Sequence, residues 1–66
     1  MAVYRVYEGV PVLGEHEELR VYGLRDDAIA HAQEHAKKGG VPTFVERAEI
    51  DTEFDHEGNA IPREEY

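Results

Sequence analysis

The sequence predicts a small α+β protein: a two-layer sandwich of order β-β-α-β(-β), with one helix on one face of a mostly antiparallel three- to four-stranded sheet. Three observations lead to this class. Runs rich in Val and Tyr are interrupted by Gly and Pro, which is typical of strands. One Ala-rich segment has helical periodicity and charged ends. A single helix can cover only one sheet face, so the other face should be open.

Two strands are predicted ahead of the helix. Residues 2–8 read AVYRVYE and residues 18–23 read ELRVYG, and both runs are rich in residues that favour extended backbone. Between them, Gly9, Pro11 and Gly14 break the pattern and predict a loop that reaches about Glu17.

The helix is the most strongly indicated element. It should begin at Asp26 or Asp27 and end at Gly39–Gly40, with acidic residues in the first turn and lysines in the last. Its apolar stripe consists largely of small alanine side chains, so we expect the helix to lie close against the sheet. The predicted stripe is Leu24, Ala28, Ile29, Ala32 and Ala36, and the bulk beneath it should come from Tyr4, Val6, Leu19, Val21, Phe44, Ile50 and Phe54.

A third strand is predicted from Val41–Pro42 to about Phe54. Phe44, Glu46 and Ile50 are separated by even numbers of residues, so on a regular strand all three side chains would point to the same face. A bulge near Val45–Glu46 is therefore needed to turn the Glu46 carboxylate outward. Residues 55–59 read as a turn and residues 60–61 as a short return strand. We therefore expect a single domain over residues 1–61 and a frayed acidic tail over residues 62–66.

Composition limits the function classes. The 66 residues carry a formal net charge of −8 and include no cysteine, which excludes disulfides and thiolate metal sites. A core of this size is marginal, so a homodimer is a fair expectation. An acidic chain is a poor binder of nucleic acid and suits a protein partner with a basic surface. No leader or membrane-spanning run is evident, which predicts a soluble, cytoplasmic protein without membrane contact.

Carboxylates recur at every second position near the C-terminus. On one extended strand they would form a solvated acidic row opposite the apolar residues between them. Such a row could imitate the charges of nucleic acid and dock in a basic groove. The alternative is that the charges protect an edge strand from aggregation. The row comprises Glu49, Asp51, Glu53, Asp55 and Glu57.

The open sheet face is predicted to carry arginines and tyrosines. If Tyr4, Val6, Leu19 and Val21 point toward the helix, their neighbours point away from it. The neighbours that point away are arginines and tyrosines, which are enriched at protein interfaces, and they predict a partner or dimer face. Pairing of the arginines with carboxylates across strands is the alternative. The set is Arg5, Tyr7, Arg20, Tyr22 and Arg47.

A metal-responsive module is the alternative function. His31 and His35 lie four residues apart on the helix, and Asp27 lies one turn earlier. The carboxylates from Glu53 to Glu57 also have a spacing similar to that of a calcium loop. Partly buried structural histidines are the favoured interpretation, because the pair lacks a firmly placed third ligand. No cofactor is predicted.

Catalysis has little support in the sequence. Cysteine and serine are absent, and Thr43 and Thr52 are the only hydroxyl candidates besides tyrosine. We therefore expect a non-catalytic protein-binding module, an acidic inhibitor or modulator that covers a basic, nucleic-acid-facing surface of its target. In size, acidity and lack of catalytic residues the chain resembles phage-encoded anti-defence inhibitors as a class. A structural subunit of a homo-oligomer is a further alternative.

Overall fold

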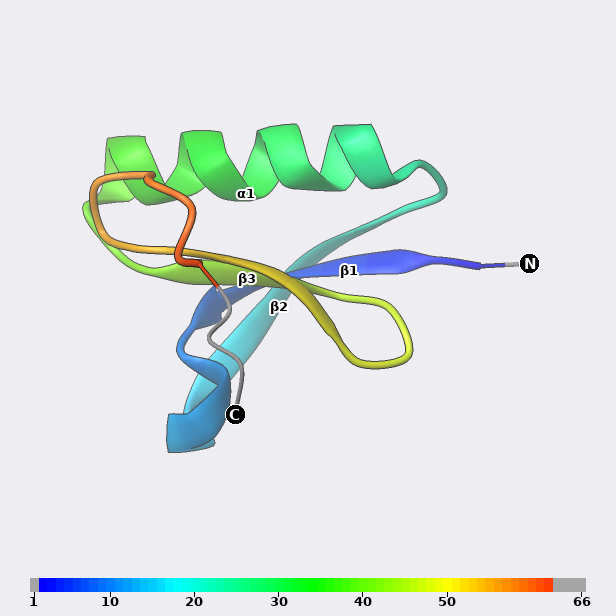
Figure 1. Ribbon diagram of the computed structural model, residues 1–66, viewed down its shortest axis with the longest axis horizontal. Coiled ribbons are helices and arrows are strands. Elements are labelled where there is room, and N and C mark those ends of the chain that lie inside the picture. The colour runs from blue at the N-terminus through cyan, green and yellow to red at the C-terminus, as the bar shows by residue number, and fades with distance from the viewer. Residues whose placement is uncertain (1, 63–66) are drawn as a thin grey trace.

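The computed structural model describes residues 2–62 and places one helix across one face of a four-stranded sheet (Figure 1). In chain order the elements are β1 (Tyr4–Gly9), the 3₁₀ turn η1 (Pro11–Leu13), β2 (His16–Tyr22), α1 (Arg25–Gly39), β3 (Thr43–Glu46) and β4 (Ile50–Phe54). This confirms the predicted α+β class. None of the helices in residues 2–62 is long and apolar enough to cross a membrane.

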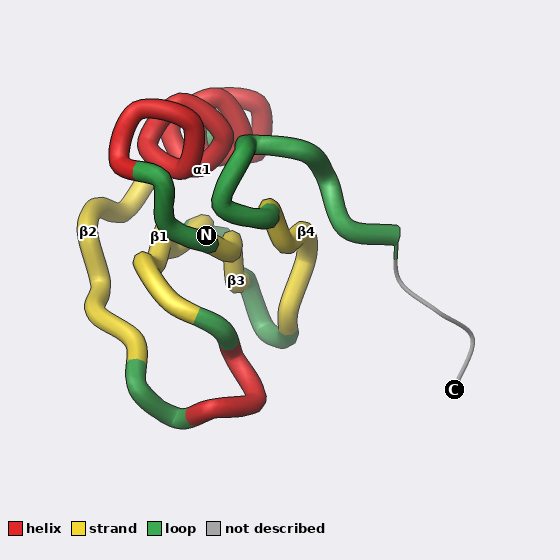
Figure 2. The backbone as a smooth tube through the Cα atoms, turned by 90° about the vertical axis from the view of Figure 1, so that its left-hand side faces the viewer, coloured by secondary structure: helices red, strands yellow, loops and turns green. Residues whose placement is uncertain are grey.

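The sheet is antiparallel throughout, with the order β2-β1-β3-β4 (Figure 2). The central strands β1 and β3 place Val6 opposite Val45 and Tyr7 opposite Phe44. After β4 the chain turns back, Ala60 bridges to Phe54, and the Ile61 amide donates to the Glu53 carbonyl at 2.8 Å. This is the predicted return strand. The predicted tail lies, from residue 63 onward, outside the described residues.

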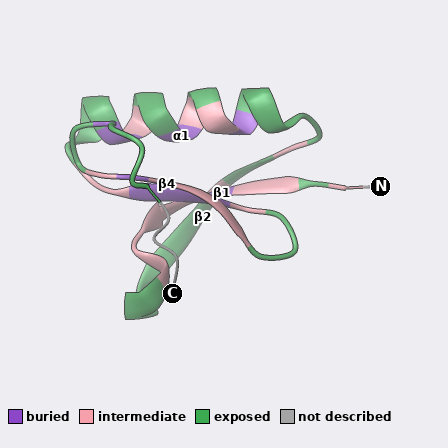
Figure 3. Cartoon of the chain, viewed as in Figure 1, coloured by how far each residue is buried: buried purple, intermediate pink, exposed green. Residues whose placement is uncertain are grey.

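The small helix stripe is confirmed. Ala28, Ala32 and Ala36 are fully buried and pack on the strand residues Val6, Val45 and Phe54 (Figure 3). Methyl side chains let the helix approach the sheet closely, which is why the core can close with so few large residues. Leu24 does not belong to this stripe: it is the residue before the first helical turn and is 66% exposed.

The predicted long third strand is two short strands. Residues 47–49 turn the chain so that β4 pairs with β3 as a hairpin, with the Arg47 amide donating to the Glu49 carbonyl at 3.0 Å. The turn contains neither glycine nor proline, and polar and apolar residues continue to alternate through it. Periodicity alone could not separate one strand from two. The expected irregularity is present, as the β3–β4 register shifts between Val45 and Glu46.

Side-chain orientation differs from the prediction in β3. Phe44 lies opposite Tyr7, on the face away from α1, and Val45 takes the core position that the sequence had suggested for Phe44. Because Val45 pairs with the buried Val6, strand alternation requires its neighbour to point the other way.

Orientation also differs in β2, where a bulge reverses the alternation. The β1–β2 register shifts between Val6 and Tyr7, so that Val6 pairs with Arg20 and Tyr7 with Glu18, with Leu19 between them. One extra residue moves all later side chains to the opposite face. As a result Tyr22 packs against the core under α1, while Val21, predicted to be inside, is 39% exposed.

Candidate functional site

The five carboxylates of the predicted acidic row do not form a single row. Glu49 lies in the turn before β4, Asp51 and Glu53 lie on β4, and Asp55 and Glu57 lie in the following turn. The chain direction changes at both turns, so the regular spacing of an extended strand is lost. The prediction failed because it required one continuous strand.

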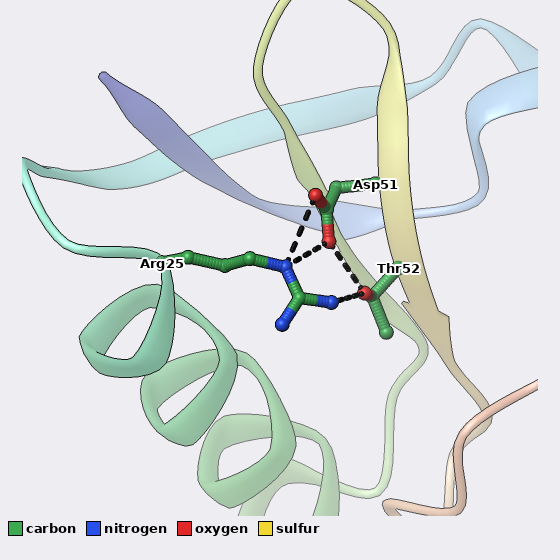
Figure 4. A network of polar contacts seen from close by, with 3 residues as sticks. All are labelled: Arg25, Asp51 and Thr52. Carbon is green, nitrogen blue, oxygen red and sulfur yellow. Dashed lines mark hydrogen bonds and ion pairs between the residues drawn. The ribbon is translucent and has the colours of Figure 1, made fainter. Parts of the chain in front are cut away.

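Asp51 holds the N-terminus of α1 against β4 (Figure 4). Arg25 Nε donates to both oxygens of Asp51, at 2.9 and 3.2 Å, and Thr52 Oγ1 donates to Asp51 Oδ1 at 2.7 Å. The Asp51 side chain is 22% exposed. It therefore has a structural role within the chain.

Asp55 organises the turn after β4. Its Oδ1 accepts the backbone amides of Glu57 and Asn59, both at 2.9 Å. The bond from Asn59, followed by the bond from Glu57, lowers the pKa of Asp55. This carboxylate is also committed to the fold, so only Glu49, Glu53 and Glu57 of the predicted row are available to a partner.

The predicted arginine–tyrosine face is divided between the two sides of the sheet. Arg5 and Tyr7 lie on the open side, as predicted, and Arg5 forms an ion pair with Glu18 at 3.0 Å. Arg20 and Tyr22 lie on the helix side because of the bulge, with the Arg20 guanidinium 5.3 Å from the centre of the Tyr22 ring.

Arg47 lies apart from the remaining pair. It is in the β3–β4 turn, and its guanidinium is 5.8 Å from the centre of the Tyr4 ring, which packs against the core under α1. The set therefore does not form one contiguous interface.

An aromatic cluster covers the open face near the end of β1. Tyr7 stacks on Phe44 with ring centroids 4.8 Å apart, and His16 meets the two rings edge-on at 5.1 and 5.2 Å. Phe44 is 1% exposed, Tyr7 is half-buried and His16 is exposed, so the cluster shields the Phe44 ring from solvent. Burial, with the neighbouring charges of Glu46 and Glu18, raises the pKa of the Tyr7 phenol.

The helix histidines lie together without a third metal ligand. The rings of His31 and His35 are 6.1 Å apart, and His35 Nε2 lies 2.8 Å from Glu8 Oε1 on β1. Asp27 shares an open hollow with His31, lined also by Tyr22, Ala30 and Glu34. Among residues 2–62, no group of three His, Asp or Glu side chains could hold a metal ion.

His31 is confined between α1 and β2. Its ring meets Tyr22 edge-on at 5.6 Å, and its Nδ1 atom is buried without a hydrogen-bond partner in residues 2–62. Burial lowers the pKa of His31, and the positive charges of His35 and Arg20 lower it further. His31 is thus a neutral packing residue near pH 7.

The end of the β1–β2 hairpin carries a hollow and an exposed apolar turn in a segment that the sequence prediction treated as a loop. It projects beyond the sheet on the side away from α1 (Figures 1 and 2). At its base is an open hollow of about 420 Å³, and the titratable side chains that line it are three glutamates and one histidine. The lining residues are Glu8, Gly9, Glu15, His16, Glu17, Val41 and Pro42.

The tip of this hairpin is apolar. Val12 is 88% exposed and Leu13 is 69% exposed, within the 3₁₀ turn η1. A signal for this tip was present in the sequence: two large apolar residues between Pro11 and Gly14 occupy a position where polar residues are usual.

Comparison with known proteins adds no information on function. The chain matches no protein-family model, no curated protein and no solved structure. Function must therefore be inferred from the charges and surfaces of the chain itself.

Proposed function

We propose that this chain is a non-catalytic protein-binding module whose partner presents a basic surface, and that the acidic end of the β1–β2 hairpin makes the contact. The supporting observation is the distribution of charge: five of the six Lys and Arg side chains in residues 2–62 contact a carboxylate or a tyrosine ring within the chain, and many carboxylates face solvent. A surface of this kind steers and orients a basic partner.

Most of the basic side chains in residues 2–62 have contacts within the chain. Arg5 pairs with Glu18 at 3.0 Å, Arg25 with Asp51 at 2.9 Å and Lys38 with Glu34 at 3.1 Å. Two further arginines, Arg20 and Arg47, lie over tyrosine rings. These contacts leave little positive charge to offset the outward-facing carboxylates.

The hairpin end offers carboxylates without internal partners. Glu15 and Glu17 are exposed and form no ion pair with any residue that the structure describes. They line the hollow together with Glu8, beside the apolar Val41 and Pro42. A Lys or Arg side chain fits this chemistry, because its aliphatic part can lie on apolar atoms while its charge meets carboxylates.

Neither threonine hydroxyl is positioned as a nucleophile. Thr43 is 1% exposed and its Oγ1 donates to the Ala32 carbonyl at 2.8 Å. Thr52 Oγ1 donates to Asp51. Both hydroxyls are committed to structural hydrogen bonds, which favours binding over catalysis.

Inhibition of a nucleic-acid-handling target remains a prediction from the sequence. Its geometric premise, a regular row from Glu49 to Glu57, is absent from the fold. A basic partner is still expected on grounds of charge, because the chain carries a net −8.

The test compares two charge reversals of equal size. Tagged wild type, the double variant Glu15→Lys/Glu17→Lys and the double variant Glu49→Lys/Glu57→Lys are used to capture proteins from native cell lysate at low and high salt. We expect wild type to retain a basic protein at low salt and to lose it at high salt.

The two variants separate the candidate surfaces. The hairpin variant should lose the partner, and the control, which changes net charge equally, should keep most of it. Loss only in the Glu49/Glu57 variant would assign binding to the predicted acidic row. Absence of any salt-sensitive partner would contradict the proposed function.

A further inference from the structure

The apolar tip of the β1–β2 hairpin is a hydrogen-bonded turn. The Leu13 amide donates to the Val10 carbonyl at 3.1 Å, and the Gly14 amide donates to the Pro11 carbonyl at 3.4 Å. Pro11 also restricts the start of the turn. Val12 and Leu13 are therefore displayed on a closed turn, and their immobilisation on binding would lose little entropy.

The base of the hairpin is fixed as well. Gly9 has φ 124°, and a side chain there would lie 2.7 Å from the Glu15 carbonyl oxygen, so the two strands approach closely at this point. The Gly9 amide donates to the Pro42 carbonyl at 2.8 Å, which ties the hairpin to the segment that leads into β3. The tip thus keeps a defined position relative to the acidic hollow.

Val12 and Leu13 are apolar side chains exposed on a projecting turn, and this exposure needs an explanation. Burying a side chain such as Val or Leu is favourable, and this gain in free energy is forgone while the side chain stays in water. Val12 and Leu13 do not stabilise the fold, because neither belongs to its buried core. Exposed apolar patches of this kind mark interaction sites.

We propose that Val12 and Leu13 form the apolar anchor of this interface and insert into an apolar cleft bordered by Lys or Arg side chains on the partner protein. The inference rests on the proposed function and specifies the partner surface. The apolar pair would supply binding energy at the centre, while Glu15 and Glu17 supply charge complementarity at the edge.

The negative charge of the hairpin end favours a basic protein as the partner over a second copy of the chain or a membrane. A second copy of the chain would bring Glu15 and Glu17 close to the same carboxylates and would be repelled. An anionic membrane surface would be repelled for the same reason. A basic protein partner satisfies both the apolar tip and its acidic surroundings.

The experiment measures the affinity of the partner identified by the capture described above, after its purification, by calorimetric titration. The variant Val12→Ser/Leu13→Ser should bind at least about tenfold more weakly than wild type. The control Leu24→Ser removes an apolar side chain that is 66% exposed at the start of α1 and should change affinity less than about twofold. Unchanged circular dichroism spectra would show that the variants remain folded.

Four results would overturn the anchor. Equal affinity of wild type and the Val12→Ser/Leu13→Ser variant would exclude it while leaving the proposed function intact. Sedimentation showing a wild-type dimer that the variant cannot form would assign the tip to a second copy. Flotation of wild type but not the variant with phosphatidylcholine vesicles would assign it to a membrane. Failure to capture any partner would contradict the proposed function itself and the anchor with it.

Discussion

At the scale of single residues, short polar contacts connect elements that are distant in the sequence. Thr43 Oγ1 donates to the Ala32 carbonyl at 2.8 Å, which joins β3 to α1. Gln33 Nε2 donates to the Gly58 carbonyl at 2.9 Å, which joins α1 to the turn after β4. Each contact satisfies a polar group that packing would otherwise leave without a partner. In a core with so few large side chains, such contacts fix the position of the helix on the sheet.

The pKa of His31 should be measurably low. In an NMR titration we expect it to fall below the ordinary value of 6.5, because burial and the charges of His35 and Arg20 disfavour the protonated ring. A pKa for His31 at or above 6.5 would contradict the burial argument.

The same shift should make stability depend on pH. The native state binds fewer protons at His31 than the unfolded chain, so the unfolding free energy falls as pH drops from about 6.5 through the folded pKa. Denaturant titrations at several pH values measure this dependence. The variant His31→Gln should lose this part of the pH dependence of the unfolding free energy, and His56→Gln should keep it.

The charge of Asp55 should stabilise the turn after β4 in a different pH range. Its pKa lies below 3.8 because backbone amides donate to the carboxylate, first from Asn59 and then from Glu57. The stabilisation is therefore complete above pH 3.8 and is lost as pH falls through the folded pKa. Thermal unfolding of wild type and Asp55→Asn should differ at pH 7 and converge at low pH. A constant difference would contradict this account.

At the scale of elements, the ends and the buried stripe of α1 were predictable, and the strand faces were not. The helix carries its own signals: acidic residues in the first turn, lysines in the last and Gly40 in the left-handed region after the end, with φ 66°. Strand faces depend on pairing. The bulge at Leu19 moves Arg20 and Tyr22 to the helix side, and nothing within β2 alone specifies it.

The close approach of α1 to the sheet leads to a prediction about residue size. Ala32 is fully buried, so Ala32→Leu should destabilise the protein by about 1–3 kcal/mol, because the added atoms force the two layers apart. Ala30 is exposed on the same helix, and Ala30→Leu should change stability little. Urea unfolding of both variants measures the difference; similar effects at the two positions would contradict the packing argument.

At the scale of the whole molecule, excess negative charge is the dominant property. The formal net charge is −8, and the exposed ion pairs, such as that of Arg5 with Glu18, each contribute less than about 1 kcal/mol. Repulsion among the remaining carboxylates should therefore exceed the attraction within pairs. The charge favours a basic partner and disfavours association with a second copy.

Salt should consequently stabilise the isolated chain. Raising the ionic strength from 0.01 to 0.15 M shortens the Debye length from about 30 to about 8 Å and screens the repulsion, so the melting temperature should rise. Scanning calorimetry in NaCl and in KCl checks this and controls for specific ion effects. A melting temperature that falls with salt would show that the ion pairs outweigh the net charge.

The sequence by itself determined the two strands before the helix, the approximate bounds of the helix, its alanine stripe and the acidic charge, because these depend on local propensity, short-range periodicity and composition. Only the tertiary structure decided that residues 43–54 form two strands, that Tyr22 turns inward and that carboxylates gather beside the Val12–Leu13 tip. Those features arise from strand pairing across the chain. One bulge or one turn changes which face a side chain occupies, and a local pattern of alternation is compatible with either outcome.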